Sequence, residues 1–162
     1  ALLGWPGRAS VFSAPARAAL AATSFMEAVA LCPMSRQTFG ILPKVAEVDR
    51  SMTPRLQSEV IEVHPELSFA ALNEPRPATP SGGRAMIWSK KTGPGQDERR
   101  AVLRPWFGEI RLRARPTGVG VDDVLDAYAA LWTATRVARG EALRIPADPE
   151  TDARGLRMEI RI

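Results

Sequence analysis

The sequence contains a single cysteine, Cys32, among its 162 residues. One thiol cannot form a disulfide within the chain or build a zinc site from cysteines, so neither kind of support is expected. Long apolar runs are also absent, since no stretch approaches the roughly 20 apolar residues that a membrane span needs. The start at Ala1 lacks the features of a secretory signal. We therefore expect a cytoplasmic protein without a membrane span.

Several catalytic and cofactor motifs are missing as well. The sequence has no Gly-x-Ser-x-Gly elbow, which argues against a serine hydrolase. It has neither the Gly-x-Gly-x-x-Gly fingerprint of dinucleotide sites nor a P-loop. We therefore expect no small-molecule cofactor and no acyl-transfer chemistry.

The composition is that of an ordinary globular protein. Hydrophobic residues make up 45% of the chain and charged residues 25%, which suits one domain with its own core over residues 1–162. Lysine and arginine number 22 against 18 acids, a net charge of +4. This weak positive balance is compatible with a nucleic-acid partner but does not require one, and a homo-oligomer also stays open.

The hydrophobic spacing predicts helices separated by loops and short extended segments. Helices are expected over residues 14–31, 37–52, a short stretch from Pro65, 96–107 and 121–140. Residues 58–64 alternate polar and apolar and are rich in β-branched side chains, which predicts a strand. Extended pieces are expected at 143–146 and 156–162, with 109–115 a strand or an extended edge. Residues 73–83 and 90–95 are rich in proline and glycine and should form loops.

Three aspartates near the start of the predicted helix 121–140 are the first candidate site. Asp122 and Asp126 are four residues apart, and Asp123 and Asp126 three, so the carboxylates crowd one helical side. Such hard oxygen ligands suit Mg²⁺ or Mn²⁺. Alternatively, Asp122 or Asp123 caps the helix and the others are solvated.

The chain's one histidine lies among acids in the second candidate. Glu62 and His64 would point to one face of the predicted strand, and Glu66 follows at the strand-to-helix corner. A histidine beside carboxylates can bind a metal or shuttle protons, but it is often a structural hydrogen-bond partner. Both interpretations remain open.

The third candidate is a basic segment with flexible neighbours. Lys90 and Lys91 precede a glycine-rich stretch, and Arg99 follows it. Cations next to flexible glycines could hold a phosphate backbone; the alternative is that they are solvated loop charges.

These motifs together resemble one family. The segments that carry the resemblance are residues 10–15, 41–44 with 47–49, 62–66, 89–92, 122–127 and 155–160. They resemble the domain-of-unknown-function family 429 (DUF429), whose members are described as predicted nucleases. The resemblance implies an α/β fold of the RNase H-like type, with a mixed sheet flanked by helices.

The resemblance also implies roles for the candidate residues. RNase H-like nucleases hold divalent metals with carboxylates from strands and a late helix, and the metals activate water at a phosphodiester. The implied metal ligands are Glu62, Asp122, Asp123 and Asp126, with Mg²⁺ or Mn²⁺ as cofactor, Glu62, Asp123 and Asp126 as catalytic residues, and His64 and Glu66 as alternates. Lys90, Lys91 and Arg99 would contact the nucleic acid.

The chain departs from the family pattern at its beginning. Family members start with a glycine-rich strand that carries an aspartate, and no such segment precedes Ala1. We therefore expect this chain to hold the C-terminal two-thirds of the domain, without the N-terminal strand. The alternative function is a non-catalytic nucleic-acid-binding or structural module with the same fold.

Overall fold

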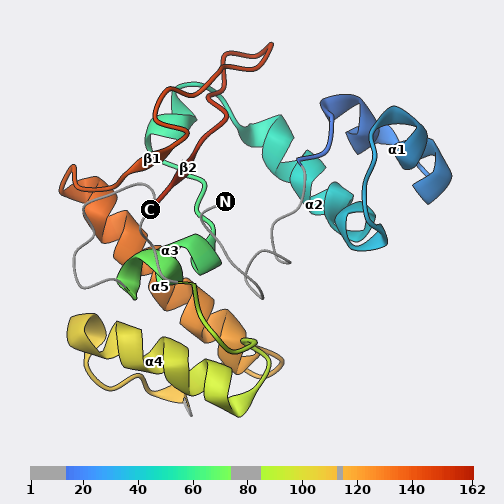
Figure 1. Ribbon diagram of the computed structural model, residues 1–162. Helices are drawn as coiled ribbons and strands as arrows, with labels where there is room; N and C mark the ends of the chain where they lie inside the picture. Colours follow the sequence, from blue (N-terminus) through green and yellow to red (C-terminus); the bar gives the residue numbers. More distant parts are fainter. Residues whose placement is uncertain (1–13, 74–84, 113–114) are drawn as a thin grey trace. The chain divides into compact units, whose positions relative to one another are not determined.

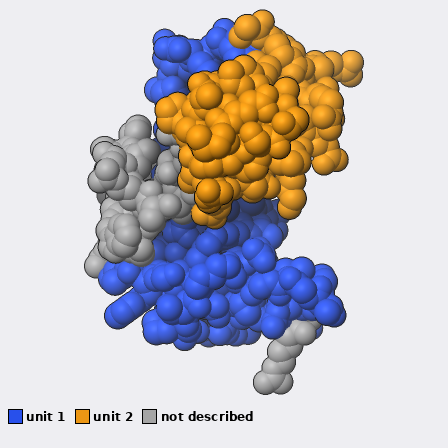
Figure 2. Space-filling view, turned by 90° about the vertical axis from the view of Figure 1, so that its right-hand side faces the viewer, with its two compact units in different colours: residues 1–10, 61–152, 157–162 blue, residues 11–60, 153–156 orange. Residues whose placement is uncertain are grey.

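A computed structural model describes residues 14–73, 85–112 and 115–162 (Figure 1). The chain divides into two compact units, which Figure 2 colours separately. Unit 1 comprises residues 1–10, 61–152 and 157–162, and unit 2 comprises residues 11–60 and 153–156. The candidate residues therefore all belong to unit 1.

Unit 2 consists of short helical segments. They are the 3-10 helix η2 (Arg17–Ala21), α1 (Phe25–Leu31), α2 (Arg36–Ser51) and the 3-10 helix η3 (Leu56–Ser58). The helix predicted over 37–52 is confirmed by α2. The single helix predicted over 14–31 is wrong at its centre, because Ser24 starts a new helix there. Its hydroxyl accepts a hydrogen bond from the Glu27 N–H at 3.2 Å, and serine favours such caps over helix interiors.

Arg154 fixes residues 153–156 to the end of α2. Its guanidinium donates hydrogen bonds to the backbone carbonyls of Asp49 and Met52 at 2.7 and 2.8 Å. It also donates to the Asp49 carboxylate at 3.0 Å. A cation here satisfies carbonyl groups that the last helical turn leaves open.

Three helices form most of unit 1. They are α3 (Pro65–Leu72), α4 (Gly93–Phe107) and α5 (Val121–Ala138), which confirm the predicted helices (Figure 1). Their apolar faces share one buried cluster, which consists of Phe69, Met86, Leu103, Ile110, Leu125 and Ala129. Gly140, with φ of +70°, follows α5 in a conformation that favours glycine and ends the helix.

Two short strands pair near the C-terminus. β1 (Arg144–Ile145) and β2 (Ile160–Arg161) are antiparallel and confirm the predicted extended pieces. Their apolar side chains pack with Leu67 and Ala70 of α3. Over its described residues the chain is therefore a mixed α/β protein with five α-helices and a two-stranded antiparallel sheet.

The strand predicted over residues 58–64 is wrong. Leu56–Ser58 form a 3-10 turn, and Val63 alone of this segment pairs, in an isolated parallel bridge with Arg161. β-branched residues favour a strand only where a neighbouring strand supplies a ladder, and here Val60 is exposed.

Two further expectations concern the extended piece 109–115 and the predicted loops. Residues 109–112 and 115 contain no strand, while 113–114 and residues 74–83 of the predicted loop 73–83 lie outside the described residues. The predicted loop 90–95 is a turn up to Thr92, after which α4 begins. Within the described part of the chain, every helix is too short or too polar to cross a membrane.

Candidate functional site

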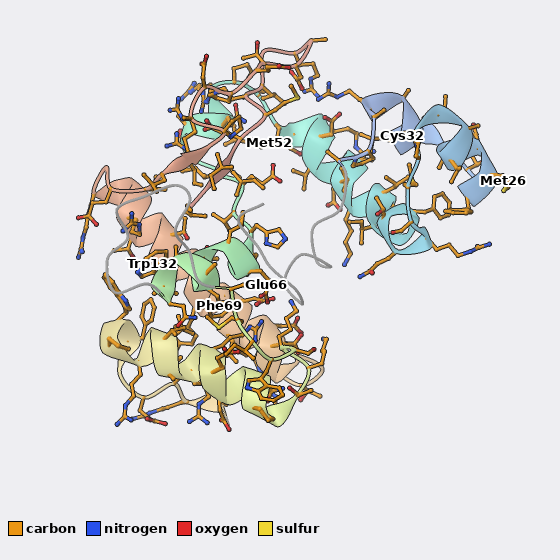
Figure 3. All side chains as sticks on the ribbon, viewed as in Figure 1. Met26, Cys32, Met52, Glu66, Phe69 and Trp132 are labelled. Carbon is orange, nitrogen blue, oxygen red and sulfur yellow. The ribbon has the colours of Figure 1, made fainter. Side chains whose placement is uncertain are left out.

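Helices α3, α4 and α5, with the turn before α4, bring six charged side chains into interaction within unit 1. We call this group the carboxylate site. Its members are Glu66, Lys90, Lys91, Arg99, Asp122 and Asp126. Figure 3 labels Glu66 and Phe69, which lie on α3 beside α5. All six residues are among the candidates predicted from the sequence.

Glu66 and Arg99 form a buried ion pair. The Arg99 Nη2 donates to both carboxylate oxygens of Glu66, at 2.7 and 2.8 Å, and the two side chains are 2% and 6% exposed. The Arg99 Nη1 donates to the backbone carbonyls of Trp88 and Gly95 at 3.1 and 2.9 Å. Arg99 therefore faces the interior of unit 1 and links α4 to α3 and to the turn before α4.

Gly95 allows this arrangement because it has no side chain. A Cβ atom at this position would lie 2.0 Å from the carbonyl oxygen of Ser89, far inside contact distance. The same turn is held by Thr92, whose hydroxyl accepts from the Gly95 N–H at 3.3 Å and donates to the Ser89 carbonyl at 2.8 Å. Lys90 and Lys91 are thus carried on a turn that is fixed at both ends.

Asp126 has one paired and one open carboxylate oxygen. Its Oδ2 accepts from the Lys90 Nζ at 2.6 Å. Its Oδ1 is buried and accepts no hydrogen bond from any described residue. Burial raises the pKa of Asp126, the negative charge of Glu66 adds to this, and the ammonium of Lys90 opposes it without cancelling it. A buried oxygen without a donor is costly unless something else occupies that position.

Asp122 is one helical turn away and binds the other lysine. Its Oδ2 accepts a short hydrogen bond from the Lys91 Nζ. Burial alone would raise the pKa of Asp122, but the Lys91 ammonium outweighs it and the pKa is lowered. The same contact raises the pKa of Lys91. The Lys91 side chain is 70% exposed, so its charge is accessible from solvent.

Asp123 does not share the environment of its two neighbours. Its Oδ2 accepts from the backbone N–H of Gly120 at 2.9 Å, at the N-terminus of α5, and the residue is exposed. It therefore has the capping geometry that the sequence left open for this acid. The three carboxylates expected on one side of the helix divide into a pair, Asp122 and Asp126, and a cap.

Glu62 and His64 lie just before α3. Glu62 is exposed as a whole residue, but partial burial of its carboxyl raises its pKa, and the nearby charge of His64 opposes this only in part. His64 is half-buried, and its backbone carbonyl accepts the first hydrogen bonds of α3, from Leu67 and Ser68. The predicted strand is absent here, but Glu62 and His64 still interact electrostatically.

The carboxylate site has the donor chemistry for a hydrated divalent ion. Over the described residues, no group of three or more histidine, cysteine or acidic side chains forms a ready metal cluster. Mg²⁺ does not need one, since it keeps several waters and is commonly held by one or two carboxylates. Asp122 and Asp126, with the open Oδ1 of Asp126, fit that requirement.

Comparison with known proteins gives one match. The sequence model of a family described as "Protein of unknown function (DUF429)" matches residues 1–151. Neither the curated proteins nor the solved structures contain a significant match.

Proposed function

The chain belongs to the DUF429 family, and we propose that it is a metal-dependent nuclease of the RNase H-like type that hydrolyses phosphodiester bonds of nucleic acid. The observation that carries this proposal is the Asp126 carboxylate, whose buried Oδ1 accepts no hydrogen bond within the described structure. Such an oxygen, on a carboxylate one turn from a second one, is suited to a cation.

Asp122 and Asp126 would hold Mg²⁺ or Mn²⁺. The bound ion would supply Lewis-acid activation of water and stabilisation of the leaving oxygen. Asp123 would fix the start of α5 rather than act as a third ligand, since its Oδ2 already accepts from Gly120. Glu62 and His64 remain candidates from the family resemblance for further ligands.

The lysines would orient both the acids and the substrate. Lys90 and Lys91 hold the two aspartates in fixed positions through ion pairs. Their flexible ammonium groups can also contact a phosphate of the nucleic acid, for which the exposed Lys91 is well placed. The role expected for Arg99 as a backbone contact is not part of this proposal, because Arg99 is buried against Glu66.

One observation favours the alternative of a non-catalytic module. Each of the three buried or half-buried acids of the carboxylate site is paired with its own cation, as Glu66–Arg99, Asp126–Lys90 and Asp122–Lys91. Such a network is charge-balanced and can serve stability alone. The two functions differ in whether a divalent ion binds and whether the substrate is cleaved.

The proposal is tested with labelled single-stranded, duplex and branched nucleic acids in the presence of Mg²⁺ or Mn²⁺. Asp126→Asn removes the negative charge that a bound cation requires and should abolish cleavage. Asp123→Asn is the matched control, because it removes the same charge three residues away and the asparagine amide oxygen can still accept from the Gly120 N–H. Cleavage by the wild type and by Asp123→Asn, but not by Asp126→Asn, supports the nuclease. Absence of both cleavage and metal binding in the wild type would overturn it and favour the module.

A further inference from the structure

The C-terminal strand segment alternates charged and apolar side chains. Arg157, Glu159 and Arg161 alternate with Met158, Ile160 and Ile162. In an extended chain, alternate residues point to opposite faces. Ile160 and Ile162 pack with Leu67 and Ala70 of α3. The charged side chains therefore belong to the other face of the β1–β2 pair.

β1 adds a further arginine to this face. Arg144 lies directly opposite Arg161 in the antiparallel register. The neighbouring pair, Leu143 and Ile162, exchanges both backbone hydrogen bonds, at 2.7 and 3.1 Å. Arg144 and Arg161 therefore occupy a non-hydrogen-bonded position, where opposing side chains are closest. Like charges in such a pair are destabilising unless an anion lies between them.

Glu159 supplies only part of the required negative charge. Its carboxylate is 5% exposed and has the Nε atoms of three arginines around it, Arg144 at 2.9 Å, Arg157 at 3.2 Å and Arg161 at 3.1 Å. Burial raises the pKa of Glu159, but the arginines outweigh burial and the pKa is lowered. Two of these guanidinium groups, those of Arg144 and Arg161, face each other across this one carboxylate, which leaves an excess of positive charge between them.

The arginines contact Glu159 in a way that leaves donors available. Arg144 and Arg161 both use Nε, and their terminal amino groups form no hydrogen bond with any described residue. Their side chains are 39% and 19% exposed, so a ligand can reach them from solvent. Planar guanidinium groups with free amino donors are well suited to the oxygens of a phosphate.

We propose that Arg144 of β1 and Arg161 of β2, held on either side of Glu159, form a binding site for a phosphate group. Glu159 holds the three guanidinium groups in position, and the phosphate completes the charge balance between Arg144 and Arg161. This arginine site shares no residue with the carboxylate site and does not depend on metal binding or cleavage. It also includes residues beyond 151, where the family match ends.

Titration with inorganic phosphate tests the site. The arginine Nε–Hε resonances of the full chain and its melting temperature are followed against sodium chloride at equal ionic strength. Phosphate should shift the Arg144 and Arg161 resonances and raise the melting temperature, whereas chloride should not. Arg144→Gln should weaken phosphate binding by roughly tenfold or more, the effect of losing a charged hydrogen bond.

Two further variants separate binding from stability. Arg139→Gln removes the same charge at an exposed position after α5 and should bind phosphate as the wild type does. Arg144→Lys keeps the charge without the planar fork, so the fold is retained and binding is weaker than in the wild type. Absence of a phosphate shift in the wild type, or equal affinity in Arg144→Gln, would overturn the proposal.

The source of the phosphate follows from a second titration with a short single-stranded oligonucleotide. If the oligonucleotide binds more tightly than inorganic phosphate and the gain is lost in Arg144→Gln, the site takes a nucleic-acid backbone phosphate. If inorganic phosphate binds equally well, the site takes the phosphate group of a small molecule. Binding of neither ligand contradicts the site, irrespective of any nuclease activity of the chain.

Discussion

One nitrogen of Arg99 donates hydrogen bonds to both carboxylate oxygens of Glu66, at 2.7 and 2.8 Å, inside unit 1. The Arg99 guanidinium also lies 5.3 Å from the centroid of the Phe69 ring. α3 and α4 are thereby joined by an ion pair that is itself covered by an aromatic side chain. The pair also keeps a second negative charge close to Asp126.

We predict strong coupling between Glu66 and Arg99. Glu66→Gln leaves a buried guanidinium uncompensated and should lower the free energy of unfolding by about 3–5 kcal/mol. Arg99→Met leaves a buried carboxylate and should cost a similar amount. The double variant should lose much less than the sum of the two, because neither charge remains. Urea denaturation of all four proteins measures the coupling, and additive losses would contradict it.

Gly95→Ala should destabilise the turn that carries Lys90 and Lys91. The added Cβ would meet the backbone carbonyl of Ser89 at 2.0 Å, so the turn must move and the Arg99–Gly95 hydrogen bond must be strained. We expect a loss of about 2 kcal/mol or more in the free energy of unfolding. Gly93→Ala is the control in the same helical turn, where a Cβ meets nothing within 4 Å. Equal effects of the two substitutions would show that the close approach does not matter.

Asp126 should make stability depend on pH in the metal-free protein. Its folded-state pKa is raised by burial, so between its usual value of about 4 and the raised value the folded state binds more protons than the unfolded state. Stability should therefore fall as the pH rises through that window. Asp126→Asn lacks this titrating group, so its free energy of unfolding should not show this fall. Relative to the wild type, the variant should therefore become more stable as the pH rises.

Denaturation between pH 4 and 7 in the presence of a chelator measures this difference. Asp148→Asn, at an exposed turn position, is the control and should follow the wild-type pH profile. A difference between Asp126→Asn and the wild type that stays constant over this range would contradict the burial effect.

Asp123 should stabilise the N-terminal end of α5. Asp123→Ala removes the acceptor for the Gly120 N–H and should cost about 1 kcal/mol of stability. Asp123→Asn should recover most of this loss, since its amide oxygen can still accept the hydrogen bond from the Gly120 N–H. Thermal unfolding of the two variants tests the difference, and equal losses would mean that the charge, rather than the cap, is what matters.

The sequence predicted the helices better than the strands. α4 and α5 were expected because their apolar spacing matches a buried helical face, and this requires only local information. Residues 58–64 have the composition of a strand, but whether a strand forms depends on a partner that is distant in the sequence. Val63 has only a single bridge to Arg161, 98 positions later.

The candidate site was predicted as a set of residues but not as pairs. Asp122 and Asp126 were recognised from their spacing, whereas their lysine partners lie 31 and 36 positions away. The partnership of Glu66 with Arg99 depends on the packing of α3 against α4, which no local pattern reveals. One signal was available, namely a single charged residue within the otherwise uncharged and largely apolar stretch of α3, since a buried carboxylate requires a cation.

The arginine face on β1 and β2 was missed for a similar reason. The alternation of Arg157, Glu159 and Arg161 is visible in the sequence, but its meaning depends on Arg144 lying opposite Arg161. Register between strands follows from their packing on α3 and cannot be read from either strand alone.

The most direct test of the central claim is Mn²⁺ binding at the start of α5, followed by paramagnetic broadening of backbone amide resonances. We expect broadening centred on Asp122 and Asp126 in the wild type and in Asp123→Asn, displacement of Mn²⁺ by excess Mg²⁺, and loss of broadening in Asp126→Asn. Wild-type spectra in which Mn²⁺ leaves the α5 resonances unchanged, or broadening that persists unaltered in Asp126→Asn, would contradict it.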